Sequence, residues 1–210
     1  MSERASQNQK IFCIGRNKTG TTSLGAALQN AGLTLGSQNT GESLVYDWAA
    51  RKFDRIVEFA RSAQAFQDVP FSLPYTYQIL DHSFPGSKFI LSVRDNEDQW
   101  YASAVRFHTK IIGQNRIPTA DDLKNFMYHH QGYVWDVTRL TYGINEETLY
   151  DEKIFKSHYL RHNYAVREYF RYRPRDLLVI NLADDQAEAR LGSFLGLESF
   201  AGILPHLNKS

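Results

Sequence analysis

Two glycines enclose a short loop that is rich in hydroxyl and basic side chains. The segment is Gly15-Arg-Asn-Lys-Thr-Gly-Thr-Thr22, and it follows a short apolar run. Glycine lets the backbone approach a ligand closely, so the peptide N–H groups of such a loop can point at a bound anion. Thr21 and Thr22 add hydroxyl donors, and Lys18 adds a positive charge on a flexible stem. This composition predicts a binding site for a phosphate or a similar anion.

The position of Lys18 distinguishes this loop from the one that binds nucleoside triphosphates. In that loop a lysine directly follows the second glycine, and a Ser or Thr after it binds magnesium. Here Thr21 occupies the lysine position, and Lys18 lies two residues before Gly20. An ordinary kinase or ATPase is therefore disfavoured, although a nucleotide kinase with an unusual loop stays an alternative.

A second basic element follows the segment with the strongest strand pattern. Residues 88–93 are rich in β-branched, aromatic and other apolar side chains, which predicts a buried strand. Arg94 comes next, and Ser103 lies within a helix predicted over 97–110. The guanidinium group of Arg94 could bind an anion. The alternative is that Arg94 forms a surface salt bridge with Asp95 or Asp98.

Apolar runs and amphipathic stretches alternate along the chain and must position these residues. Buried strands are predicted at 10–15, 65–69, 88–93 and 176–181. Helices are predicted at 23–32, 42–63, 74–84, 97–110, 121–142, 153–173 and 186–195. Buried strands that alternate with helices are typical of an α/β fold. We therefore expect a three-layer sandwich with a mostly parallel central sheet.

Composition limits the classes of protein to consider. The 210 residues suit a single domain over 1–210, in which the aromatic-rich stretch of about 110–172 would form a helical lid or acceptor region. A formal charge of +1 argues against a nucleic-acid partner, and the single cysteine, Cys13, excludes a disulfide within the chain. Polar N-terminal residues and the lack of a long apolar segment predict a cytoplasmic enzyme with no membrane partner.

The two basic elements together resemble a known family. Lys18-Thr-Gly-Thr-Thr22 resembles the 5′-phosphosulfate loop of the sulfotransferases, which take a sulfuryl group from 3′-phosphoadenosine-5′-phosphosulfate (PAPS). Residues 88–103 are similar to the 3′-phosphate element of that family, whose usual spacing would place the serine at Ala102. The resemblance implies a bacterial-type, P-loop-like sulfotransferase fold without a metal. The donor-binding residues that it implies are Arg16, Asn17, Lys18, Thr19, Gly20, Thr21, Thr22, Arg94 and Ser103.

The resemblance also implies two catalytic roles. Lys18 would stabilise the leaving phosphate. Asp68, in Phe66-Gln-Asp-Val-Pro70, corresponds to the position where cytosolic relatives carry a histidine base. A partly buried aspartate can have its pKa raised towards a useful value. Asp68 could instead cap the helix that follows Pro70, and His82 and His108 are rival bases.

The predicted function is transfer of a sulfuryl group from PAPS to a hydroxyl or an amine of an unidentified acceptor. The acceptor is expected to be a small molecule, and the aromatic side chains of 110–172 favour one that is aromatic or apolar. Two alternatives stay open at this point: a P-loop nucleotide kinase, and a non-catalytic domain that binds a nucleotide or a partner. The sequence does not indicate an oligomeric state.

Overall fold

The structure is a computed structural model that describes residues 9–197. The chain divides into two compact units. The first contains the residues up to Val93 and those from Asn163 onward, and the second is Arg94–His162. The predicted site residues are therefore divided between them, because the glycine loop and Asp68 belong to the first unit and Arg94 and Ser103 to the second.

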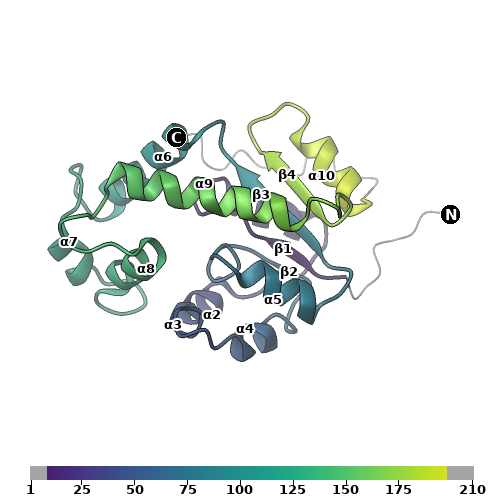
Figure 1. The fold of residues 1–210 in the computed structure, drawn as a ribbon, viewed down its shortest axis with the longest axis horizontal. Coiled ribbons are helices and arrows are strands. Elements are labelled where there is room, and N and C mark those ends of the chain that lie inside the picture. The colour runs from purple at the N-terminus through teal and green to yellow at the C-terminus, as the bar shows by residue number, and fades with distance from the viewer. Residues whose placement is uncertain (1–8, 198–210) are drawn as a thin grey trace. The chain divides into compact units, whose positions relative to one another are not determined.

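The first unit contains a four-stranded parallel sheet (Figure 1). Its strands are β1 (Ile11–Cys13), β2 (Ala65–Phe66), β3 (Lys88–Val93) and β4 (Leu177–Asn181), in the order β2-β1-β3-β4. Ile11 pairs with Ala65 on one side and with Lys88 on the other, and Phe89 pairs with Leu177. All three pairings are parallel, which confirms the predicted α/β class.

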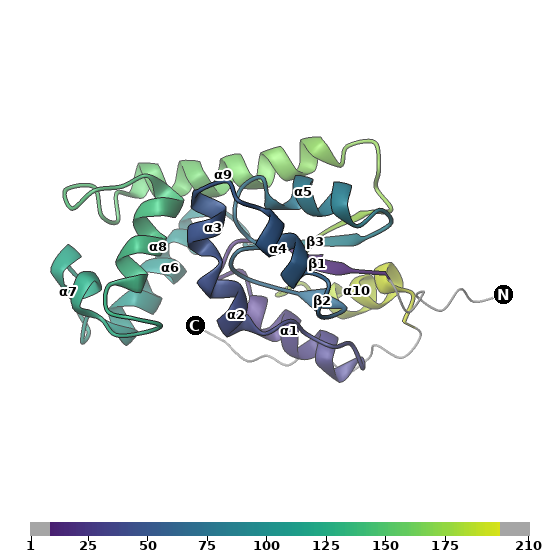
Figure 2. The ribbon, with the colours of Figure 1, turned by 90° about the horizontal axis from the view of Figure 1, so that it is seen from below.

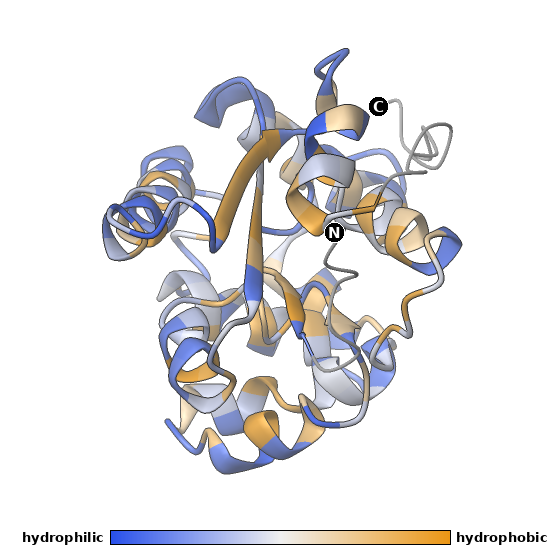
Figure 3. Ribbon diagram, turned by 90° about the vertical axis from the view of Figure 1, so that its right-hand side faces the viewer, coloured by the Kyte–Doolittle hydropathy of each residue, from blue (hydrophilic) through white to orange (hydrophobic). Residues whose placement is uncertain are grey.

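Helices cover both faces of this sheet. Side chains on successive strand residues point to opposite faces. Ile11 and Cys13 pack with α1 (Thr21–Asn30) and α10 (Ala187–Leu195). The opposite face carries Phe12, whose ring lies 5.8 Å from those of Phe66 and Phe71. Figure 2 shows α1 and α10 on one side of the strands and α4 and α5 on the other, and Figure 3 shows that the strands are mostly hydrophobic. The three-layer arrangement is confirmed.

The single helix predicted over 42–63 is wrong. Three short helices occupy this region: α2 (Gln38–Ser43), α3 (Val45–Ala49) and α4 (Asp54–Phe59). Arg51 has a φ of 60°, in the left-handed region, so helical backbone cannot continue through it. By contrast α5 (Thr76–Ser83) falls within the predicted range 74–84, and begins after Tyr75, whose φ is 68°. Left-handed residues therefore separate α3 from α4 and precede α5, whereas α2 and α3 meet at Leu44, whose φ is −84°.

The second unit is helical. It contains α6 (Glu97–Ile111), α7 (Ala120–Asn125), α8 (Tyr133–Tyr142) and the first part of α9 (Glu152–Tyr169). The helix predicted over 121–142 is interrupted, because Met127 and Gln131 form an antiparallel bridge and Gly132 has a φ of 83°. The core of this unit is aromatic: Trp100 stacks on Tyr159 at 4.6 Å. Much of the aromatic content of this region therefore serves packing.

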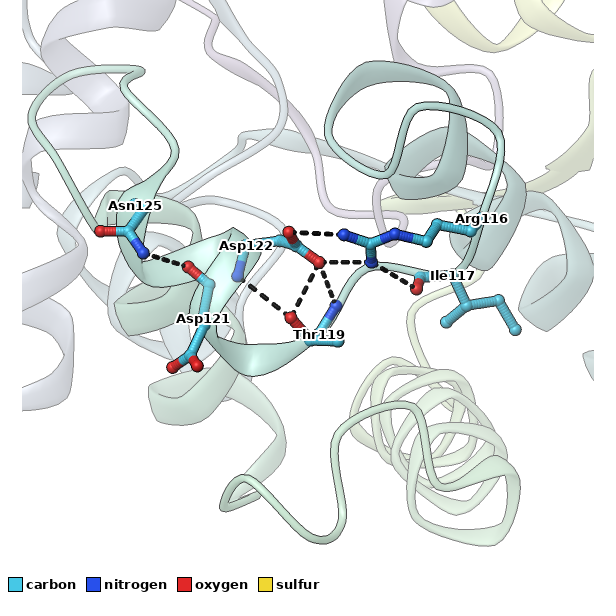
Figure 4. A network of polar contacts seen from close by, with 6 residues as sticks. All are labelled: Arg116, Ile117, Thr119, Asp121, Asp122 and Asn125. Carbon is cyan, nitrogen blue, oxygen red and sulfur yellow. Dashed lines mark hydrogen bonds and ion pairs between the residues drawn. The ribbon is translucent and has the colours of Figure 1, made fainter.

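A polar network precedes α7 (Figure 4). The guanidinium group of Arg116 donates two hydrogen bonds to the Asp122 carboxylate, at 2.6 and 2.9 Å. The backbone N–H and the hydroxyl of Thr119 donate to the same carboxylate, and the Asp122 N–H donates back to the Thr119 hydroxyl. These donors, Arg116 first, hold the pKa of Asp122 well below its usual range. The side chains of Arg116, Thr119 and Asp122 therefore fix the start of α7.

None of the helices in residues 9–197 combines the length and the apolar character that crossing a lipid bilayer requires.

Candidate active site

The glycine loop joins β1 to α1 and is fixed by contacts with β3. The Thr19 hydroxyl donates to the Arg16 carbonyl at 2.6 Å and shares a hydrogen bond of 2.6 Å with the Ser92 hydroxyl. A Cβ at Gly15 would lie 2.2 Å from Ser92 Oγ and 2.5 Å from its carbonyl oxygen, so only glycine fits there. The loop is thus held in a defined shape by contacts within the first unit.

The start of α1 is left open by this loop. Gly20, with a φ of 94°, is the residue that precedes the helix, and within the described chain no side chain caps its first amides. The first turn contains no acidic residue. The initial N–H groups of a helix have no partner inside the helix, and the helix dipole places partial positive charge there. This arrangement suits a phosphate-sized anion.

Arg16 lies in the interior of the first unit. The residue is only 2% exposed, and its Nη1 donates a hydrogen bond to the Ser72 carbonyl at 2.8 Å. An arginine in a polar loop could have faced solvent, but the structure shows that Arg16 does not. The contact ties the loop to the segment that follows Pro70.

Asp68 lies beside the same loop. It follows β2 with a φ of 62°, its Oδ1 accepts from the Val69 N–H at 2.9 Å, and its Oδ2 accepts from the Thr21 hydroxyl at 3.4 Å. The alternative role as a helix cap is not observed, because the next helix begins only at Thr76. Asp68 and the first residue of α1 are therefore in direct contact.

The environment of Asp68 favours its protonated form. Burial of the carboxyl group raises its pKa above the ordinary value, and the negative charge of Glu42 acts in the same direction. Three groups lower the pKa of Asp68 without cancelling this increase: the Val69 N–H, the Arg16 guanidinium and the Thr21 hydroxyl. A carboxylate with a raised pKa is a better proton acceptor near neutral pH than an ordinary one.

The second basic element lies in the other unit. Arg94 is half-buried, and its backbone N–H donates to the Tyr159 hydroxyl at 3.0 Å. Ser103 lies on the buried face of α6 with 5% exposure, and its Oγ has no hydrogen-bond partner among residues 9–197. Ala102, which the usual spacing would select, is exposed. Of the two candidate surface partners of Arg94, Asp98 forms an ion pair with Lys156, and Asp95 Oδ2 accepts a hydrogen bond from Gln99 Nε2 at 2.9 Å.

Residues 10–210 match the family model described as sulfotransferase domain. This chain belongs to the sulfotransferase-domain family. No curated protein matches it significantly. Family membership supports sulfuryl transfer as its general chemistry and agrees with the parallel sheet and the glycine loop described above.

Glu42 is a residue of this sulfotransferase domain that the sequence did not single out. It lies on α2, is 8% exposed, and its Oε1 accepts a hydrogen bond from Gln38 Nε2 at 2.8 Å. An isolated glutamate in a polar stretch ordinarily indicates an exposed helix face. The only sequence signal was its neighbour Gly41, a residue that permits close packing but has many other uses.

The histidines of the sulfotransferase domain are less suited to the role of base. His82 is exposed in the last turn of α5. His108 belongs to the second unit, where its Nδ1 lies 2.8 Å from the Tyr150 hydroxyl. His158 and His162 are buried on α9. Across the described ranges, no three His, Cys, Asp or Glu side chains are grouped in a way that could hold a metal ion.

Proposed function

We propose that this protein transfers a sulfuryl group from PAPS to a hydroxyl or an amine of a small acceptor. The observation that carries the proposal is the contact of Thr21 with Asp68, which brings a candidate base to the uncapped start of α1. An anion site and a proton acceptor are thereby adjacent within one unit. The family match supports the same class of reaction.

The donor would be held by two groups of residues. The loop Arg16–Thr22 would bind the 5′-phosphosulfate, since Thr19 fixes the loop to Ser92 and α1 offers its first N–H groups. Arg94 and Ser103 would bind the 3′-phosphate, and the buried Oγ of Ser103, which has no hydrogen-bond partner within 9–197, fits that role. PAPS, when bound, supplies the activated sulfuryl group.

Two side chains would act in the transfer itself. Asp68 would take the proton from the attacking hydroxyl or amine at one of its carboxylate oxygens. Lys18 would place its ammonium group near the leaving phosphate and offset the negative charge that develops there. The left-handed backbone of Lys18, with a φ of 68°, sets the direction in which its side chain leaves the loop. An aromatic or apolar acceptor and a cytoplasmic location stay predictions from the sequence.

Calorimetric titration with 3′-phosphoadenosine-5′-phosphate tests the donor site. We expect the wild type to prefer this nucleotide to adenosine 5′-diphosphate, and Arg94→Ala to lose roughly tenfold to a hundredfold of that preference, because a hydrogen bond to a charged group contributes about 1.5–3 kcal/mol. Arg106→Ala, which removes an exposed charge from α6, is the matched control. Tighter binding of ATP with Mg²⁺ would favour the kinase, and binding of none of these nucleotides would favour a non-catalytic domain.

A further inference from the structure

We propose that Glu42 is a positioning residue for Asp68: the two form a carboxylate pair that is connected by the side-chain amides of Gln38 and Gln67. This inference rests on the proposed function, since it assigns a partner to the base of that reaction. Nothing in the spacing of the sequence indicates the pair, because 25 residues that include α3 and α4 lie between its members.

Helix α2 packs directly on the peptide that follows Asp68. A Cβ added at Gly41 would lie 2.9 Å from the Val69 carbonyl oxygen and 3.5 Å from Pro70 Cδ. Only glycine therefore permits this approach of the two backbones. Glu42 is the next residue of the helix, and its low exposure shows that it is enclosed by the first unit instead of extending into solvent.

A chain of side-chain amides holds Glu42 in place. Gln67, which directly precedes Asp68, donates from Nε2 to Gln38 Oε1 at 2.9 Å. Gln38 in turn donates from Nε2 to Glu42 Oε1 at 2.8 Å. Gln67 is itself packed against α1, because a Cβ at Gly25 would lie 3.5 Å from its Cγ. The amides thus connect the strand end that carries Asp68 with the carboxylate of Glu42.

The charges around Asp68 are few and oppose one another. Arg16, from the loop, and the Thr21 hydroxyl, from α1, favour the carboxylate, as does the Val69 N–H. Glu42, from α2, disfavours it and adds to the larger effect of burial. A like charge near a buried carboxyl group increases its affinity for a proton. Removing the charge of Glu42 should therefore leave Asp68 ionised to lower pH and weaken it as a base.

The experiment measures the titration of Asp68 directly. Carboxyl ¹³C NMR across pH follows its resonance, which Asp68→Asn identifies. We expect Glu42→Gln to move this titration to lower pH. With 2-naphthol as the acceptor probe, the acidic limb of the pH profile of PAPS turnover should move in the same direction. Glu58→Gln removes the same charge from an exposed residue of α4 that pairs with Arg61, and should move neither. A role of Glu42 in packing alone would not produce this pattern.

A second variant keeps the test decisive if Glu42→Gln does not fold. Gln38→Leu retains Glu42 but removes the amide that donates to it, and should shift the Asp68 titration in the same direction by a smaller amount. An Asp68 titration that is unchanged in both variants would overturn the pair while leaving the proposed function intact. Failure of the wild type to bind 3′-phosphoadenosine-5′-phosphate would instead overturn the proposed function, and with it the role of Glu42.

Discussion

Two strands of the sheet lead into helices, and the two helix starts are built in different ways. At the β1–α1 junction, the residue before the helix is Gly20, which has no side chain to offer. At the β3–α6 junction, Asn96 Oδ1 accepts from the Gln99 N–H at 2.8 Å, and Gln99 Oε1 accepts from the Asp95 N–H at 3.1 Å. Glu97 and Asp98 add negative charge to the first turn of α6, whereas the first turn of α1 has none.

This difference indicates how each junction can bind an anion. The start of α6 is satisfied by its own side chains and is acidic, so a phosphate there must be bound by side chains such as Arg94 and Ser103. The start of α1 is open, so a phosphate there can be bound by the backbone. Substitutions at the two junctions should therefore have different consequences.

The largest effect is expected at Asp68, the proposed base, which contacts the first residue of α1. Asp68→Asn keeps the shape of the side chain, and asparagine tolerates the left-handed backbone at this position. We expect PAPS turnover to fall by about 10²–10⁴-fold, the usual contribution of a general base. In the wild type, turnover should decline as the pH falls through the raised pKa of Asp68. Turnover close to the wild-type rate in Asp68→Asn would direct the search for the base elsewhere.

Asp68→Asn, which should lower turnover, should raise the stability of the fold. Because burial raises the pKa of Asp68, the folded state binds a proton more tightly than the unfolded state. The stability that this proton confers is present at low pH and is lost as the pH rises through the raised pKa. Asp68→Asn should therefore unfold at a higher temperature than the wild type at pH 8, with a smaller difference at pH 5. An equal difference at both values would contradict the assigned pKa direction.

A matched pair of glycines tests the open junction. Gly20→Ala should cost about 1–2 kcal/mol of stability, because alanine is strained at a φ of 94°, and its Cβ would lie 2.7 Å from Leu182 Cδ1. It should also weaken binding of 3′-phosphoadenosine-5′-phosphate. Gly32 has a φ of 85° and open space around it, so Gly32→Ala should lose stability through backbone strain alone. Chemical denaturation measures the loss of stability in both variants, and calorimetry measures their affinity for the nucleotide. Equal nucleotide affinities of Gly20→Ala and Gly32→Ala would argue against binding by the backbone at α1.

The smallest effect is expected at the self-capped junction. Asn96→Ala removes the side chain that accepts from the Gln99 N–H and should cost about 1 kcal/mol of stability. Nucleotide affinity should change little, because the cap is an internal contact of α6. Urea denaturation alongside nucleotide titration measures both quantities. A large loss of affinity without a loss of stability would mean that Asn96 itself contacts the ligand.

The sheet could be predicted from the sequence because its strands are short apolar runs that are bounded by turn residues. The order of the glycine loop and Arg94 along the chain likewise follows from the motifs. The break between α3 and α4 could not be predicted, because it depends on a left-handed residue, Arg51, that no local pattern marks. Glu42 was missed for a related reason: its burial results from the packing of Gly41 on Val69, a contact between segments that are distant in sequence.

Cys13 gives the central strand a built-in reporter. It is the only cysteine of the chain, it is fully buried on β1, and burial raises the pKa of its thiol. Thiol reagents attack the thiolate, so the folded protein should resist them. Labelling can then occur only when β1 separates from its neighbours, and the rate of labelling measures how often the strand that carries the glycine loop opens. A ligand that binds the loop and stabilises the folded state would lower the rate of Cys13 labelling.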